Sequence, residues 1–138
     1  MINFYTDEVD FTYVRGFKKQ CRKWLDHSAK NEDFTIRNLN IIVTNDENLL
    51  KINNDFLGHD FFTDIITFNY NDGNKIDGEL YLSFDRIVEN ALLNKVDFLE
   101  EFNRVIIHGL LHLMGYNDST NDQITLMRTK EDNYLKLF

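Results

Sequence analysis

Residues 105–118 read VIIHGLLHLMGYND, and this stretch decides how the rest of the chain is interpreted. His108 and His112 stand four positions apart, so on a helix they share one face with Cβ atoms about 5–6 Å apart. The surrounding positions are apolar nearly all round, which is typical of a buried helix. Gly115 suits the left-handed conformation that ends a helix, and a turn there would bring Asp118 back beside the histidines. The stretch therefore predicts a buried helix with a metal site at its C-terminal end.

The donor set predicts both the ion and its chemistry. Each buried histidine left unpaired would cost on the order of 1–3 kcal/mol, and one ion would satisfy both. Two nitrogens and one carboxylate leave a coordination position for water, as in catalytic zinc sites. We expect Zn²⁺, with Mn²⁺, Fe²⁺ or Ni²⁺ as alternatives, because a carboxylate ligand makes harder ions more competitive. The other interpretation is that His108 and His112 are core side chains with ordinary hydrogen bonds and that Asp118 caps the next helix.

Gly109 argues against one class of enzyme with this ligand spacing. In metzincin proteases the residue after the first histidine is a glutamate that acts as general base. Gly109 has no side chain and cannot move a proton. A metallopeptidase is therefore disfavoured, unless Glu79 or Asp64 supplies the base from elsewhere in the fold.

The patterns on either side of the stretch predict an α+β domain. Strands are expected at 2–5, 34–43, 65–70 and 76–82, and helices at 13–29, 44–56, 83–95, 97–114 and 120–137. Asn-Asp-Gly-Asn at 71–74 is typical of a turn, so the strands flanking it should pair antiparallel. Thr44 with Glu47, and Thr120 with Gln123, have the spacing of capping boxes. We expect one compact domain spanning residues 1–138, with about four strands in a mixed sheet and the metal site on a central helix packed against it.

Composition and charge indicate in which compartment the protein works and which partners it can have. The N-terminus lacks the pattern of a secretory signal, and no apolar run approaches the roughly 18 residues of a membrane span. A single cysteine, Cys21, fits a reducing compartment, so we expect a cytoplasmic protein without a membrane partner. The net charge of −8 disfavours nonspecific binding to nucleic acid. One basic stripe at helical spacing partly offsets this charge, either as an RNA-binding surface or as a solvated helix face; it comprises Arg15, Lys18, Lys19, Arg22 and Lys23.

The segment from His108 resembles the hallmark of the YbeY family of bacterial rRNA maturation endoribonucleases, His-Gly-x-Leu-His-Leu-x-Gly-Tyr-Asp-His. It matches as far as Tyr116. Upstream, TDIITF at 63–68 is similar to the family's TDVLSF segment, and GEL at 78–80 is similar to its Gly-Asp-Ile strand. The resemblance implies a metal-dependent, single-strand-specific endoribonuclease that matures the 3′ end of 16S rRNA. Its partners would be precursor rRNA in the small ribosomal subunit and ribosome-associated proteins, and not DNA.

Two departures from the family pattern bear on activity. The third family histidine is Asp118 here, which can still ligate an ion. The family's Phe-Arg-Gly-Lys-Asp segment reads FLGHD at 56–60, so the arginine implicated in RNA cleavage is Leu57. Another group must then counter the charge that develops on the phosphate, and the candidates are Arg104, one helical turn before His108, and His59. The loss of the arginine also leaves open a non-catalytic ribosome assembly factor whose metal only stabilises the fold.

Overall fold

The computed structural model describes residues 1–138 and contains four strands and five helices. The strands are β1 (Ile2–Thr6), β2 (Thr35–Thr44), β3 (Ile65–Asn69) and β4 (Lys75–Ser83). The helices are α1 (Phe17–Asn31), α2 (Asp46–Leu57), α3 (Phe84–Asn94), α4 (Phe98–Leu113) and α5 (Asn121–Leu135). The element order and the α+β class predicted from the sequence are confirmed.

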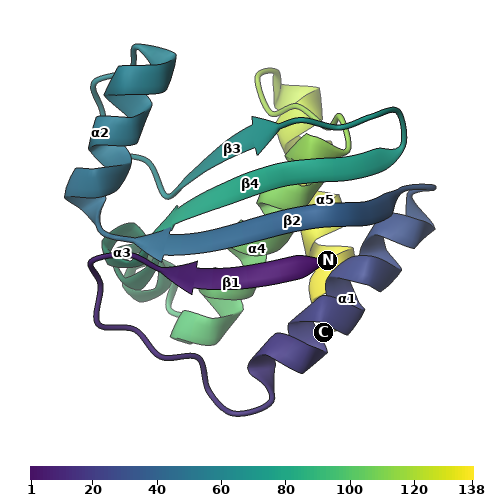
Figure 1. The fold of residues 1–138 in the computed structure, drawn as a ribbon, viewed down its shortest axis with the longest axis horizontal. Coiled ribbons are helices and arrows are strands. Elements are labelled where there is room, and N and C mark those ends of the chain that lie inside the picture. Colours follow the sequence, from purple (N-terminus) through teal and green to yellow (C-terminus); the bar gives the residue numbers. More distant parts are fainter.

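The four strands form one mixed sheet in the order β1-β2-β4-β3. β1, β2 and β4 are parallel, whereas β3 runs antiparallel to β4, as the turn at 71–74 predicts. Helices α3, α4 and α5 lie behind the sheet in the view of Figure 1, and α2 stands beside the start of β3. Side chains of β4 alternate between buried positions and half-buried positions on the opposite face. The sheet therefore has one face packed on helices and one more open face.

Helix α4 lies directly on the sheet, because two glycines allow a close approach. A Cβ atom on Gly109 would come within 2.6 Å of Ile65 Cδ1 and 2.9 Å of Leu80 Cδ2. A Cβ atom on Gly78 of β4 would come within 2.9 Å of Leu113 Cδ1. Most of α4 is buried, as predicted. Neither α4 nor any other helix is long and apolar enough to cross a membrane.

Two helix starts differ from the prediction. The first helix begins at Phe17 and not at residue 13, because Gly16 adopts a left-handed conformation with φ 86° immediately before it. The predicted Thr44–Glu47 capping box is wrong, since Thr44 still pairs with β4 and Asn45 caps α2 by accepting a hydrogen bond from the Asn48 amide at 2.8 Å. The box at Thr120 is confirmed.

Candidate metal centre

Helix α4 and the turn after it bring the three predicted ligands together. The Nε2 atoms of His108 and His112 are 2.9 Å apart. Asp118 Oδ2 lies 3.4 Å from Nε2 of His108 and 3.3 Å from Nε2 of His112. Ligand atoms held about 2.0–2.1 Å from one tetrahedral ion lie about 3.3 Å apart, so these separations fit a single ion. The turn is made by Gly115, whose φ of 98° is the left-handed conformation that the sequence predicts.

Both imidazoles are held by their other ring nitrogen. Nδ1 of His112 donates a hydrogen bond to the carbonyl oxygen of Tyr116 at 2.9 Å, and Nδ1 of His108 faces Glu131 Oε2 at 2.6 Å. A carbonyl only accepts, and an ionised carboxylate only accepts, so each Nδ1 carries the proton. Each Nε2 then presents a lone pair toward Asp118. Lone pairs from three atoms converge on one point, which is the arrangement that a cation satisfies.

The charges around His108 favour a cation at this point. Burial lowers the pKa of His108, but the hydrogen bond to Glu131 and the negative charges of Glu131, Asp118 and Asp64 outweigh it, so the net pKa is raised. Burial raises the pKa of Glu131, but the hydrogen bonds from His108 and Arg104 lower it by more than burial raises it. The net pKa is therefore below its usual value, and Glu131 stays ionised. Burial also raises the pKa of Asp64. The carboxylates that favour a protonated ring equally favour a bound metal ion.

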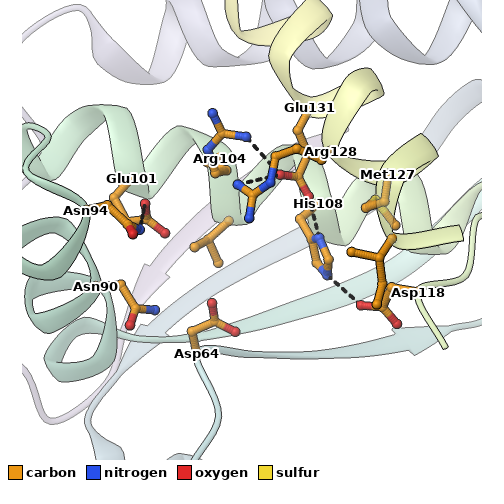
Figure 2. A pocket seen from close by; sticks show the side chains of 12 residues that line it. Asp64, Asn90, Asn94, Glu101, Arg104, His108, Asp118, Met127, Arg128 and Glu131 are labelled. Atoms are coloured by element: carbon orange, nitrogen blue, oxygen red, sulfur yellow. Dashed lines mark hydrogen bonds and ion pairs between the residues drawn. The ribbon is translucent and has the colours of Figure 1, made fainter. Parts of the chain in front are cut away.

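On one side of the centre lies a cavity of about 440 Å³, here named the charged pocket (Figure 2). Its cations face carboxylates: Arg104 Nη1 lies 2.9 Å from Glu131 Oε1, and Arg104 Nη2 lies 2.8 Å from Asp132 Oδ1. Arg128 Nη1 lies 3.5 Å from the same Glu131 oxygen. Arg104, the candidate for countering phosphate charge, therefore borders the site but is already paired with two acids. Its catalytic role stays a prediction.

On the other side lies a cavity of about 320 Å³, here named the aromatic pocket. It is lined by the connection from α2 to β3, by β3 itself, and by all three candidate ligands. Leu57 and His59 both line it, so the position of the lost family arginine does face the metal centre. No lysine or arginine lines this pocket. His59 is thus near the site, and its catalytic role also stays a prediction.

The basic stripe lies at the other edge of the sheet. Arg22 donates from Nε to the Ile2 carbonyl of β1 at 3.0 Å and lies over the Phe4 ring, whereas the aromatic pocket is formed at β3. Arg15 precedes α1, and the rest of the stripe is on α1, Lys18, Lys19 and Lys23 included. None of these residues lines either pocket at the histidines. The structure does not bring the stripe to the metal centre, and its contact with RNA stays a prediction.

Glu131 is the site residue that the sequence interpretation missed. It lies on α5 and is 4% exposed. The buried residues of α5 are Met127, Glu131 and Tyr134, spaced four and three positions apart. An acid in the buried stripe of a helix is a signal, because such a charge needs a partner. Its partner was not predictable, since His108 is 23 positions away.

A buried helix bearing two histidines and followed by a turn with a carboxylate defines a protein with the donor set of a catalytic metal site. The family model described as Endoribonuclease YbeY matches residues 2–138. The chain belongs to this family, as the sequence resemblance indicates.

Relatives and a solved structure agree with this assignment. The protein named Endoribonuclease YbeY from Cytophaga hutchinsonii is 44% identical over 129 residues, covering 93% of this chain and 90% of that protein. The protein of the same name from Flavobacterium psychrophilum is 44% identical over 138 residues, covering 100% of this chain and 96% of that protein. The solution structure of TM1509 from Thermotoga maritima matches with a TM-score of 0.68 at 27% identity, covering 99% of this chain and 87% of that chain.

Proposed function

We propose that this protein is a metal-dependent endoribonuclease that cleaves single-stranded RNA, with Zn²⁺ as the preferred ion held by His108, His112 and Asp118. Its relatives are named endoribonucleases, and this supports RNA as the substrate. The observation that carries the proposal is the convergence of two Nε2 atoms and a carboxylate oxygen at the junction of two open pockets. A substrate phosphate can reach that point from solvent.

His108, His112 and Asp118 would hold a divalent ion here, and when bound it would supply Lewis-acid chemistry toward a phosphate oxygen and acidify a bound water. The chain's own residues prepare the position. Glu131 and the Tyr116 carbonyl fix the two rings with Nε2 facing inward. The Asp64 carboxyl lines both pockets, and burial raises its pKa, so it is placed to hold a proton at the wall of the site.

The proposed target is the 3′ end of precursor 16S rRNA, in the cytoplasm. The acidic net charge and the lack of cations in the aromatic pocket argue against capture of free RNA by charge alone. We therefore propose that the small ribosomal subunit and ribosome-associated proteins present the strand to the enzyme.

The test is cleavage of a fluorescent single-stranded RNA by the purified protein after reconstitution with Zn²⁺, with Mn²⁺ or with no metal. We expect metal-dependent cutting that disappears in His112→Ala. Cutting that is insensitive to metal and to this substitution would place the activity elsewhere or in a contaminant.

The second candidate function is a non-catalytic ribosome assembly factor, and Leu57 favours it. This residue lines the aromatic pocket where the family has a cation. Stoichiometric metal binding without cleavage of any RNA, together with unfolding on metal removal, would favour the assembly factor. A metallopeptidase would need its base from elsewhere than Gly109, which packs against the sheet. Glu79 lines neither pocket, whereas Asp64 lines both, so Asp64 is the residue that could supply the missing base.

A further inference from the structure

Two rings at the rim of the aromatic pocket form an exposed stack. The rings of His59 and Phe61 have centroids 5.1 Å apart and planes 20° apart. Phe61 is 56% exposed, although it is a large apolar side chain. Both residues line the pocket that contains His108, His112 and Asp118. Exposed apolar surface beside a pocket is typical of a ligand-binding groove.

We propose that the His59–Phe61 pair is a stacking platform for one unpaired base of the RNA, next to the phosphate at the metal centre. The inference rests on the proposed function and specifies how the strand is held. A base laid on the Phe61 ring would extend the existing stack, and its neighbouring phosphate would follow the pocket wall toward the ligands.

The backbone holds this platform in place before any ligand arrives. Gly58 ends α2 with φ 67°, which turns the chain toward β3. The side-chain amide of Asn53, 2% exposed, donates to the Phe61 carbonyl at 3.0 Å, while the His59 amide donates to the Asn53 carbonyl at 3.1 Å. A platform that is already ordered loses little entropy on binding.

The chemistry of the pocket favours a base over other occupants. With no lysine or arginine and with Asp64 and Asp118 in its wall, the pocket offers phosphate groups no attraction apart from that of the ion. Stacking needs no cation, since every base has a π-face. Bases inside a duplex are already stacked on one another, so the platform would select unpaired RNA. It thereby gives a physical basis for single-strand specificity in a chain without the family arginine.

Phe62 provides a matched control within the same segment. It is 54% exposed, nearly the same as Phe61. Its ring packs under the Arg86 guanidinium at 5.7 Å, and it does not line the aromatic pocket. Substituting it removes an equal aromatic surface from the protein without touching the platform.

The experiment measures binding of a short fluorescein-labelled oligoadenylate with 2′-O-methyl riboses, which slow its cleavage, by fluorescence anisotropy on the metal-loaded protein. We expect Phe61→Ala and Phe61→Leu to weaken binding about tenfold. Phe61→Tyr, which keeps the ring, and Phe62→Ala should stay within about twofold of the original protein. An abasic oligomer of the same length should bind the original protein and Phe61→Ala equally and weakly.

Unchanged oligoadenylate binding by Phe61→Ala and Phe61→Leu would overturn the platform, and so would an equal loss for the abasic oligomer. Cleavage of unmodified RNA by the original protein reports on the proposed function separately. If the protein cleaves RNA but the Phe61 substitutions have no effect on binding, the proposed nuclease function stands and the stacking platform is rejected. If base-dependent binding is lost in the Phe61 variants but no metal supports cleavage, the stacking platform stands and the proposed nuclease function is rejected.

Discussion

The two pockets at the metal centre share Asp64, His108 and Asp118 but differ in almost everything else. In the charged pocket the guanidinium groups face carboxylates, and Glu131 is nearly inaccessible. The aromatic pocket has no cation, and its rim exposes Phe61. The cations of the charged pocket are therefore paired within the protein, whereas the aromatic pocket exposes unpaired ring surface on the side where we propose that the RNA binds.

Arg104 cannot pair with Glu131 and contact a substrate phosphate without a loss to one of them. Its Nη1 pairs with Glu131 and its Nη2 pairs with Asp132, and the first of these contacts helps to keep the buried Glu131 ionised. Moving Arg104 onto a substrate phosphate would take one of its charged partners away from that carboxylate, and a buried charge that loses a partner is destabilised. Its first task is therefore to hold Glu131, which in turn orients His108.

The largest expected effect comes from removing a metal ligand, because both metal binding and RNA cleavage depend on it. His112→Ala deletes one of three ligands, so metal affinity should fall by more than the roughly 10–100-fold that loss of an outer-shell partner costs. RNA cleavage should disappear with it. Metal content after dialysis and cleavage of fluorescent RNA check both. A variant that keeps stoichiometric metal would show that the ligand set lies elsewhere.

The charged pocket is tested by Glu131→Gln. The amide keeps the shape but removes the charge that holds Nδ1 of His108, so metal affinity should fall by about tenfold or more. Competition with a chromogenic chelator measures it. Asp132→Asn is the matched control, because Asp132 pairs with the same Arg104 but is exposed and does not contact a histidine. Equal effects of the two substitutions would contradict the special role of Glu131.

The aromatic pocket is tested by adding the cation that it lacks. Leu57→Arg should strengthen binding of single-stranded RNA by about fivefold at low salt, since one charge near a phosphate in water is worth about 1 kcal/mol. The slope of log affinity against log salt should steepen by about 0.7. Leu57→Gln, which adds polarity without charge, should leave the slope unchanged. No change in slope for the arginine variant would mean that RNA does not pass this pocket.

The smallest expected effect concerns the support of the turn behind the ligands. The Glu32 carboxylate accepts hydrogen bonds from Tyr116 at 2.5 Å, from Tyr134 and from Lys130 at 3.1 Å. Burial raises the pKa of Glu32, but these bonds lower it by more, so its folded pKa lies below the unfolded value of about 4.3. Its stabilisation is therefore present above that value and is lost as pH falls through the folded pKa.

Glu32→Gln should accordingly lower the free energy of unfolding by about 1 kcal/mol at pH 7. The difference from the original protein should shrink below about pH 4. Urea unfolding at both pH values measures it, with Asp26→Asn as the control, because Asp26 is exposed and lies on α1, the helix that Glu32 caps. A difference independent of pH would mean that shape, and not charge, is what Glu32 contributes.

Local patterns were enough to predict most of the fold. The apolar run around His108, the turn at 71–74 and the Thr120 box each depend on residues close together in the chain, and each is confirmed. One of the two failed helix starts, that of α2, concerns a choice between neighbours. Thr44 and Asn45 both suit a helix cap, and only the pairing of Thr44 with β4 decides between them.

The site was predictable only where its residues share a helix or the turn after it. His108, His112 and Asp118 lie within eleven positions, so spacing alone indicates their convergence. Glu131 and the His59–Phe61 pair reach the centre from α5 and from the α2–β3 connection, and their approach depends on tertiary packing. Sequence reasoning identified His59 through the family segment and had no signal for Phe61.

The contact between Gly109 and the sheet also limits how the protein can evolve. A glutamate at this position would complete the ligand-and-base pattern of a metzincin, but any side chain there meets Ile65 and Leu80. Making room means that both of these core side chains must shift or shrink, and an overpacked core typically costs about 1–3 kcal/mol out of a total stability of about 5–15 kcal/mol. Leu57, by contrast, is 45% exposed and open to exchange. Mutation can therefore alter how this lineage treats RNA far more readily than it can turn the same metal centre toward peptides.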